Sequence, residues 1–164
     1  GPARLTVWTY ATGKAEFEAL WRLYRLEAIQ ALRFVIDAAS LIGHHKAVTD
    51  AMAERWGANC IRVTKNHAKM TTLVGGGWHV LIDGSATLAA NLRFEQIRIS
   101  DDPGAVALVE GLADELWAKV GPQDLSTFTS TSARRLVTDV SGVQRERRRS
   151  SGVAATNFGP GFLG

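Results

Sequence analysis

Three short stretches of the chain carry side chains suited to phosphate chemistry. They are Asn66-His67-Ala68-Lys69, Gly84-Ser85-Ala86-Thr87 and Asn91-Leu92-Arg93-Phe94-Glu95-Gln96. Within about thirty residues they supply an imidazole, an ammonium, a hydroxyl, an amide and a carboxylate. An imidazole can attack phosphorus, while cationic and neutral donors stabilise the charge that develops on the phosphate oxygens. The combination predicts a site that cleaves phosphodiesters without a metal ion.

A hairpin is expected to position the first two stretches. The run 59–73 predicts one long strand, on which His67 and Lys69, two residues apart, would share a face. A triple-glycine turn and the β-branched, apolar run 78–83 then predict a return strand. That return strand would deliver Ser85 close to the level of His67 and Lys69.

The remaining chain alternates between helical and extended patterns. Apolar residues recur every three or four positions between 14 and 30, which is typical of a helix. Acidic residues followed by Pro103 predict the start of another. Strands are expected at 4–10, 32–38, 59–73, 78–83 and 92–99, helices at 14–30, 46–56 and 103–120, and a loop at 43–45. This order predicts an α/β domain whose mixed β-sheet is layered with helices.

The charge divides the chain into two parts. Residues 1–120 carry 13 Lys and Arg against 13 Asp and Glu, and we expect them to form the domain. Residues 121–164 carry six Arg against three acids and are rich in Ser, Thr and Gly, which predicts a C-terminal appendage. Its run 145–149 is either a nucleic-acid contact or a solvated or protein-docking tail.

Several classes are disfavoured by composition. No apolar run approaches the roughly 18–20 residues of a membrane helix, so no membrane partner is expected. A single cysteine, Cys60, cannot form an internal disulfide, which favours a reducing, cytoplasmic compartment. The adjacent His44 and His45 would diverge, and no third ligand accompanies them. We therefore expect neither a metal ion nor a cofactor.

The three stretches resemble the phospholipase D superfamily. The resemblance is to its single-motif branch, small nuclease-like proteins common in phages and mobile elements. There the pattern runs His-x-Lys, then Gly-Ser-x-Asn, then a downstream Asn and Glu; here it reads His67-x-Lys69, Gly84-Ser85, Asn91 and Glu95. The resemblance covers residues 4–120 and implies a phospholipase D-like fold with one motif per chain.

The resemblance also implies roles for these residues. His67 would be the nucleophile that forms a phosphohistidine, and Lys69 would hold phosphate oxygens. Ser85 would donate a hydrogen bond to the phosphate, and Glu95 would orient the imidazole of His67. Nucleic acid, DNA before RNA, is the implied partner.

Two positions depart from the family pattern. Val74 stands where the family has Asp, and Thr87 stands where it has Asn. Thr87 can still donate one hydrogen bond to substrate, and Asn91 offers a further amide. These departures keep an alternative open: a catalytically silent phospholipase D-like module that binds DNA or serves assembly in a phage or mobile-element complex.

The chemistry itself predicts a homodimer. The leaving oxygen of a phosphodiester needs a proton, and one chain offers a single suitable imidazole, His67. A symmetric partner would supply a second His67 across the two-fold axis. We therefore expect a metal-independent phosphodiesterase whose site is completed between two chains.

Overall fold

The computed structural model describes residues 1–88, 95–123 and 125 of the 164-residue chain. This part of the chain contains six strands and three α-helices, which confirms the α/β class, although five strands were expected. The strands are β1 (Ala3–Thr9), β2 (Ile29–Asp37), β3 (Ile61–Thr64), β4 (Met70–Gly75), β5 (Trp78–Gly84) and β6 (Ile97–Ser100). The helices are α1 (Lys14–Arg25), α2 (His44–Trp56) and α3 (Pro103–Lys119), with short 3₁₀ turns η1 (Ala38–Leu41) and η2 (Ala58–Cys60).

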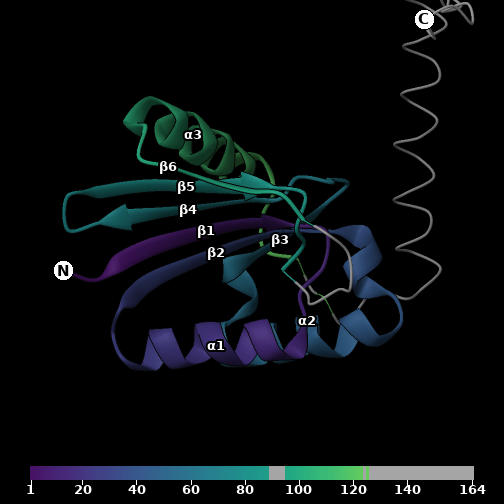
Figure 1. The fold of residues 1–164 in the computed structure, drawn as a ribbon. Coiled ribbons are helices and arrows are strands. Elements are labelled where there is room, and N and C mark those ends of the chain that lie inside the picture. Colours follow the sequence, from purple (N-terminus) through teal and green to yellow (C-terminus); the bar gives the residue numbers. More distant parts are fainter. Residues whose placement is uncertain (89–94, 124, 126–164) are drawn as a thin grey trace, which may run out of the picture.

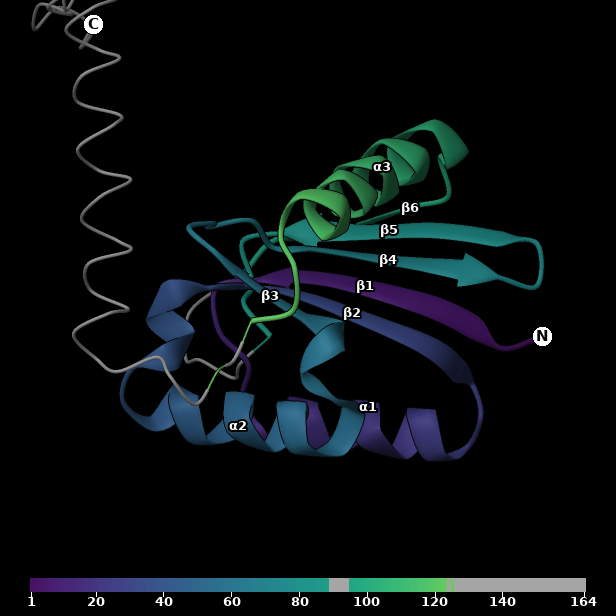
Figure 2. The ribbon, with the colours of Figure 1, turned by 180° about the vertical axis from the view of Figure 1, so that it is seen from behind.

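The six strands form one mixed sheet in the order β3-β2-β1-β4-β5-β6. Strands β1, β2 and β3 are parallel, whereas β4, β5 and β6 run antiparallel to their neighbours. Helices α1 and α2 lie on one face of the sheet and α3 lies on the other (Figures 1 and 2). The mixed, layered sheet expected from the sequence is therefore confirmed.

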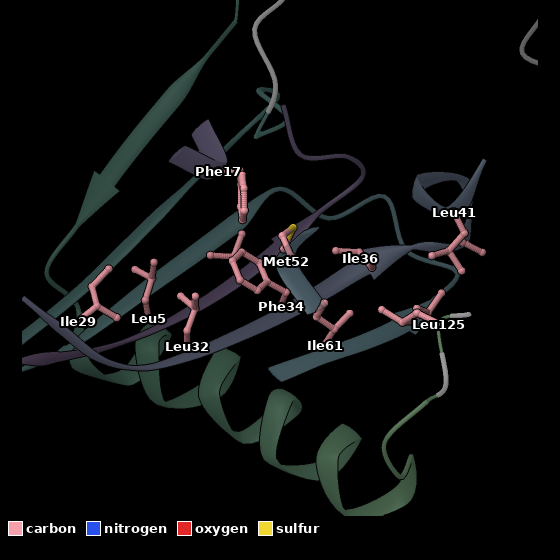
Figure 3. Close-up of a cluster of buried hydrophobic side chains, with 13 residues drawn as sticks. Leu5, Phe17, Ile29, Leu32, Phe34, Ile36, Leu41, Met52, Ile61 and Leu125 are labelled. Carbon is pink, nitrogen blue, oxygen red and sulfur yellow. The ribbon is translucent and has the colours of Figure 1, made fainter. Parts of the chain in front are cut away.

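The main core lies between the parallel strands and the α1–α2 layer. Phe34 and Ile36 of β2 are fully buried there, against Phe17 of α1 and Met52 of α2 (Figure 3). Leu125 also joins this core at 5% exposure. Leu125, which follows the expected boundary at residue 120, thus packs with side chains of the expected domain.

Helix α3 is fixed to its face of the sheet by a buried carboxylate. Glu110 is 6% exposed and forms salt bridges with Arg33 of β2 at 2.6 Å and Arg4 of β1 at 2.7 Å. It also accepts a hydrogen bond from the hydroxyl of Thr72 on β4. At the other end of the helix, the Arg62 guanidinium lies 4.5 Å from the Trp117 ring centre. These contacts tie α3 to four strands.

The hairpin and the start of α3 follow their local sequence signals. Gly76 and Gly77 have φ of 58° and 85°, which suits the two central positions of a tight hairpin turn. Asp102 caps α3 by accepting hydrogen bonds from Gly104 and Ala105, with Pro103 at the first helical position. Both features were predicted from the residues.

The expected long strand at 59–73 is wrong. The structure has two strands there, β3 and β4, separated by a loop at residues 65–69. The buried Asp37 carboxylate accepts a hydrogen bond from the Asn66 amide, and the Asn66 side chain accepts one from Ala68. This local turn interrupts the extended backbone. His67 and Lys69 therefore lie on a loop and not on one face of a strand.

Three boundaries also differ from expectation. The first helix ends at Arg25, because Glu27 adopts a φ of 56° and Ile29 already pairs with β1 as part of β2. Helix α2 begins at His44, inside the expected loop. The last strand begins only at Ile97, and residues 92–94 of the expected strand lie outside the described residues.

Candidate functional site

The candidate residues gather where several strands end. The carboxyl ends of β1, β2, β3 and β5 meet at one side of the domain, together with the start of β4 (Figure 1). Open α/β sheets bind ligands at the carboxyl ends of their strands. The loop 65–69 between β3 and β4, and the turn that follows β5, both lie at this edge.

The loop that carries His67 is held in place by Asp37, the last residue of β2. The Asp37 carboxylate accepts hydrogen bonds from the amides of Ala39 at 2.8 Å and Asn66 at 2.9 Å. The Asn66 side chain in turn accepts from the amide of Ala68 at 3.1 Å and donates to Thr64 at 3.2 Å. Residues on both sides of His67 are thereby fixed, while the His67 side chain itself is exposed.

The His67 ring contacts an aromatic ring and an ammonium. The Tyr10 ring meets it edge-on, with 5.3 Å between the ring centroids. The backbone carbonyl of Tyr10 accepts a hydrogen bond from Ser40, which holds the end of β1 against η1. Lys69 Nζ lies 3.0 Å from His67 Nδ1 and donates to the His67 carbonyl at 3.0 Å. A neutral imidazole has the acceptor nitrogen that this contact requires, and it is also the nucleophilic form.

The β4–β5 hairpin brings Lys69 beside the second motif. The Gly84 amide donates to the Lys69 carbonyl at 3.2 Å, and Ser85 follows directly. The Ser85 amide donates to the Gln96 carbonyl at 3.0 Å, while Ser85 Oγ accepts from the Gln96 amide at 2.9 Å. A Cβ at Gly84 would lie 1.9 Å from the Gln96 carbonyl oxygen, so only glycine fits there. The motif glycine thus permits the close approach of the segment containing Glu95.

Ser85 and Glu95 are direct partners. Ser85 Oγ donates a hydrogen bond to Glu95 Oε2. Ser85 is thus one partner of Glu95, and the orientation of His67 by Glu95 stays a prediction. Ser85 also lines a hollow of about 380 Å³. Asp83 and Arg98 line the same hollow and form a salt bridge with each other at 2.8 Å.

Thr87 and Lys69 line a common cavity of about 190 Å³. One wall is formed by the ends of β1 and β5, and Ile97 of β6 also contributes. The following residue, Leu88, is fixed over the end of β1, because its amide donates to Thr9 Oγ1 at 3.1 Å and its carbonyl accepts from Gly13 at 2.6 Å. Two hydrogen bonds thus hold the backbone of Leu88, one of the residues that line the cavity.

The structure brings most of the predicted residues to this edge. His67 contacts Lys69, Ser85 contacts Glu95, and Thr87 shares a cavity with Lys69. Asn91 lies outside the described residues. Position 74, where the resembling family has Asp, is a Val within β4, paired with Arg4 and His79 of the neighbouring strands.

Sequence reasoning missed the residues that support the loop. Asp37 at the end of β2 contacts Asn66, and Tyr10 directly after β1 contacts His67; no spacing within the motif indicates either residue. One signal was available: Asp37 ends an otherwise apolar, buried run, and an acid at the carboxyl end of such a strand commonly accepts from a neighbouring loop.

Cys60 is not a candidate nucleophile. Burial raises the pKa of its thiol to about 12, against a partial lowering by its backbone hydrogen bond and by Arg62. The reactive form of cysteine is the thiolate, so this thiol is inert at neutral pH.

The described residues contain neither a cluster of metal ligands nor a helix that could cross a membrane. Among residues 1–88, 95–123 and 125, no three or more His, Cys, Asp or Glu side chains gather as a group able to hold a metal ion. In the same part of the chain, no helix combines the length and apolar character needed to cross a membrane.

Comparison with known proteins does not assign a family. No protein-family model matches the sequence, and no curated protein matches it significantly. The geometry at the strand ends is therefore the main ground for a functional proposal.

Proposed function

We propose that the protein is a phospholipase D-like phosphodiesterase that cleaves nucleic acid without a metal ion, through a phosphohistidine on His67. The observation that carries this proposal is the convergence of His67, Lys69 and Thr87 with the Ser85–Glu95 pair at one edge of the sheet. A loop imidazole beside an ammonium, at the same end of the sheet as a turn that carries hydroxyl groups, is suited to binding a phosphodiester and stabilising its transition state.

The reaction has two steps. In the first, an imidazole nitrogen of His67 bonds to phosphorus, the P–O bond to one alcohol breaks, and an acid protonates that alcohol. In the second, water attacks the phosphohistidine, the P–N bond breaks, and the conjugate base of that acid accepts the proton of water. Lys69 and the hydroxyl of Thr87 would stabilise the phosphate oxygens, and Ser85 would join them by turning its hydroxyl from Glu95 to the phosphate. A second His67, from a symmetric partner, is the acid of this scheme.

A chromogenic phosphodiester tests the proposal. Purified protein should hydrolyse bis(4-nitrophenyl) phosphate in excess EDTA, and His67→Ala should abolish turnover. His79→Ala is the matched control, because His79 is also an exposed histidine but lies near the hairpin end of β5. Equal turnover by wild type and His67→Ala, or loss of turnover in EDTA with rescue by Mg²⁺ or Zn²⁺, would contradict the mechanism.

A catalytically silent DNA-binding module is the second candidate. Val74 and Thr87 favour it, because they replace the Asp and Asn of the resembling family. Such a module would bind a labelled DNA duplex with a strong salt dependence and show no diester turnover. The two candidates therefore differ in the EDTA assay and agree in the binding assay.

A further inference from the structure

A second hollow lies at the opposite end of the sheet from the candidate site. Ile29 lines it and begins β2, whereas Asp37, which ends β2, supports the His67 loop. The hollow forms where α1 leads into β2, near the N-terminus (Figure 1). Its volume of about 540 Å³ falls within the roughly 300–1,000 Å³ that is typical of small-molecule sites. We call it the α1–β2 hollow; its lining includes Trp21, Tyr24, Arg25, Glu27 and Ile29.

Two aromatic rings of the α1–β2 hollow lie nearly parallel. The ring centroids of Trp21 and Tyr24 are 5.8 Å apart, and their planes differ by 16°. Trp21 also meets the Trp56 ring at 5.7 Å, and the Arg55 guanidinium lies 5.3 Å from the Trp21 ring centre. Tyr24 remains 37% exposed. Rings that are held by neighbours and are partly open to solvent offer a stacking surface to another flat ring.

Glu27 occupies a position that the local fold disfavours. At the end of α1 the Glu27 amide donates to the Tyr24 carbonyl at 3.0 Å and the Ala28 amide to the Leu23 carbonyl at 3.1 Å, which is the Schellman pattern. Glu27 is the left-handed residue of this motif, with a φ of 56°, where glycine is usual. Its negative charge also lies at the helix C-terminus, where cations are preferred. Residues that break local rules are expected at functional sites, so the carboxylate indicates a role in the hollow.

The charges of the hollow favour a neutral ligand. Arg25 and Glu27 both line it, and among the residues that the structure describes neither side chain forms an ion pair or a hydrogen bond. A guanidinium only donates hydrogen bonds and a carboxylate only accepts them. Glu27 would repel a simple anion, and Arg25 would repel a simple cation. A flat, neutral ring with both acceptors and donors on its edge suits the two charged groups and the aromatic rings together.

We infer that the α1–β2 hollow binds a nucleobase, guanine before the others, stacked on Tyr24 and Trp21. Guanine presents two adjacent acceptors, O6 and N7, which one guanidinium can bind together. Its N1 and N2 carry hydrogens that the Glu27 carboxylate accepts. Adenine offers the guanidinium only N7 on the same edge, so it should bind more weakly. This inference does not depend on the proposed phosphodiesterase activity.

Two probes distinguish the sources from which the base could come. Isothermal titration with guanosine tests a free ligand, and because guanosine has no phosphate it does not report on the candidate phosphate site. Fluorescence anisotropy of labelled oligothymidylate with one central guanine, against the all-thymine strand, tests a base within single-stranded nucleic acid. We expect guanosine to bind about tenfold more tightly than adenosine, or the guanine-bearing strand to bind about tenfold more tightly than the all-thymine strand. No preference for guanine with either probe would overturn the inference.

Glu27→Gly separates recognition from folding. Glycine adopts the φ of 56° without strain, so this variant should unfold at a higher urea concentration than wild type. Its affinity for guanine should nevertheless fall about tenfold, because the acceptor for N1 and N2 is lost. A purely structural Glu27 would instead leave the affinity unchanged, and that result would overturn the inference.

Tyr24→Ala tests the stacking surface independently. It should also lower the affinity for guanine, because a ring on which the base stacks is removed. Leu26→Ala is the matched control, since Leu26 is 76% exposed and does not line the hollow. It should bind as wild type does. Equal affinity in Tyr24→Ala and Leu26→Ala, both folded by circular dichroism, would show that the base does not bind at the α1–β2 hollow.

Discussion

The Asp37 carboxylate accepts a hydrogen bond of 2.9 Å from the backbone amide of Asn66, the residue directly before His67. This contact joins the carboxyl end of β2 to the loop that replaces the middle of the expected long strand. Since Asp37 is 6% exposed, the acceptor is fixed within the fold and not supplied by solvent. The position of His67 therefore depends on a residue outside the motif.

Replacing Asp37 with alanine should affect both stability and turnover. The amides of Ala39 and Asn66 would each lose their acceptor, at a cost of about 1–3 kcal/mol in the free energy of unfolding. Diester turnover should fall more steeply than the folded fraction, because the His67 loop loses its support. Urea unfolding and the chromogenic diester assay measure the two effects. Asp101→Ala, at an exposed aspartate, is the control and should change neither the free energy of unfolding nor the turnover. Full turnover by Asp37→Ala would show that Asp37 does not position the His67 loop.

Lys69→Ala should weaken transition-state binding without unfolding the protein. The ammonium lies 3.0 Å from His67 Nδ1, and Lys69 lines the cavity of about 190 Å³ that Thr87 also lines. We expect kcat/KM to fall by an amount that corresponds to about 2–4 kcal/mol of lost transition-state stabilisation, as for the loss of one oxyanion donor. Lys14→Ala, at the exposed start of α1, is the matched control for loss of a lysine charge. Equal kcat/KM in the two variants would exclude Lys69 from phosphate stabilisation.

How far the sequence predicts this structure depends on how local each signal is. The hairpin was predictable, because Gly76 and Gly77 supply its turn within the segment itself. The 65–69 loop was not, because the group that interrupts the strand, Asp37, lies 29 residues away. The same holds for the contact between His67 and Tyr10. Residue types therefore predicted which side chains gather at the candidate site, such as His67 with Lys69 and Ser85 with Glu95, whereas the supporting contacts required the fold.

Glu110 should make stability depend on acid pH. Burial alone would raise its pKa, but hydrogen bonds from Thr72 and Thr6 and the charges of Arg33 and Arg4 together lower it below the usual value of 4.5. A carboxyl whose pKa is lower in the folded state contributes stability above its unfolded pKa and loses it as pH falls through the folded pKa. The contribution should be complete at about pH 6 to 7, well above the usual glutamate pKa of 4.5. It should decline below that value.

Urea midpoints of wild type and Glu110→Ala between neutral and acid pH measure this contribution. At neutral pH the substitution leaves Arg33 and Arg4 without their shared partner, at an expected cost of about 3–5 kcal/mol. The difference between the two proteins should shrink as the pH falls. Exposed Glu115→Ala, which removes only a surface pair with Lys119, should cost little at any pH. A constant difference across the pH range would contradict the assignment.

Removing the C-terminal region should weaken nucleic-acid binding while leaving small-diester hydrolysis unchanged. The truncation belongs after Leu125, because Leu125 is part of the core and Gln123 accepts a hydrogen bond from the Val63 amide at 2.7 Å. Deleting residues 126–164 removes six Arg and two acids, so fewer phosphates would be neutralised. Each lost phosphate contact should reduce the slope of log affinity against log salt by about 0.9 for duplex DNA. Fluorescence anisotropy of a labelled duplex over a range of salt concentrations measures affinity and slope together.

Full-length protein in which Arg145, Arg147, Arg148 and Arg149 are each replaced with Gln separates the effect of charge from that of chain length. Unchanged affinity and slope in both proteins would show that the Arg run serves a partner other than nucleic acid.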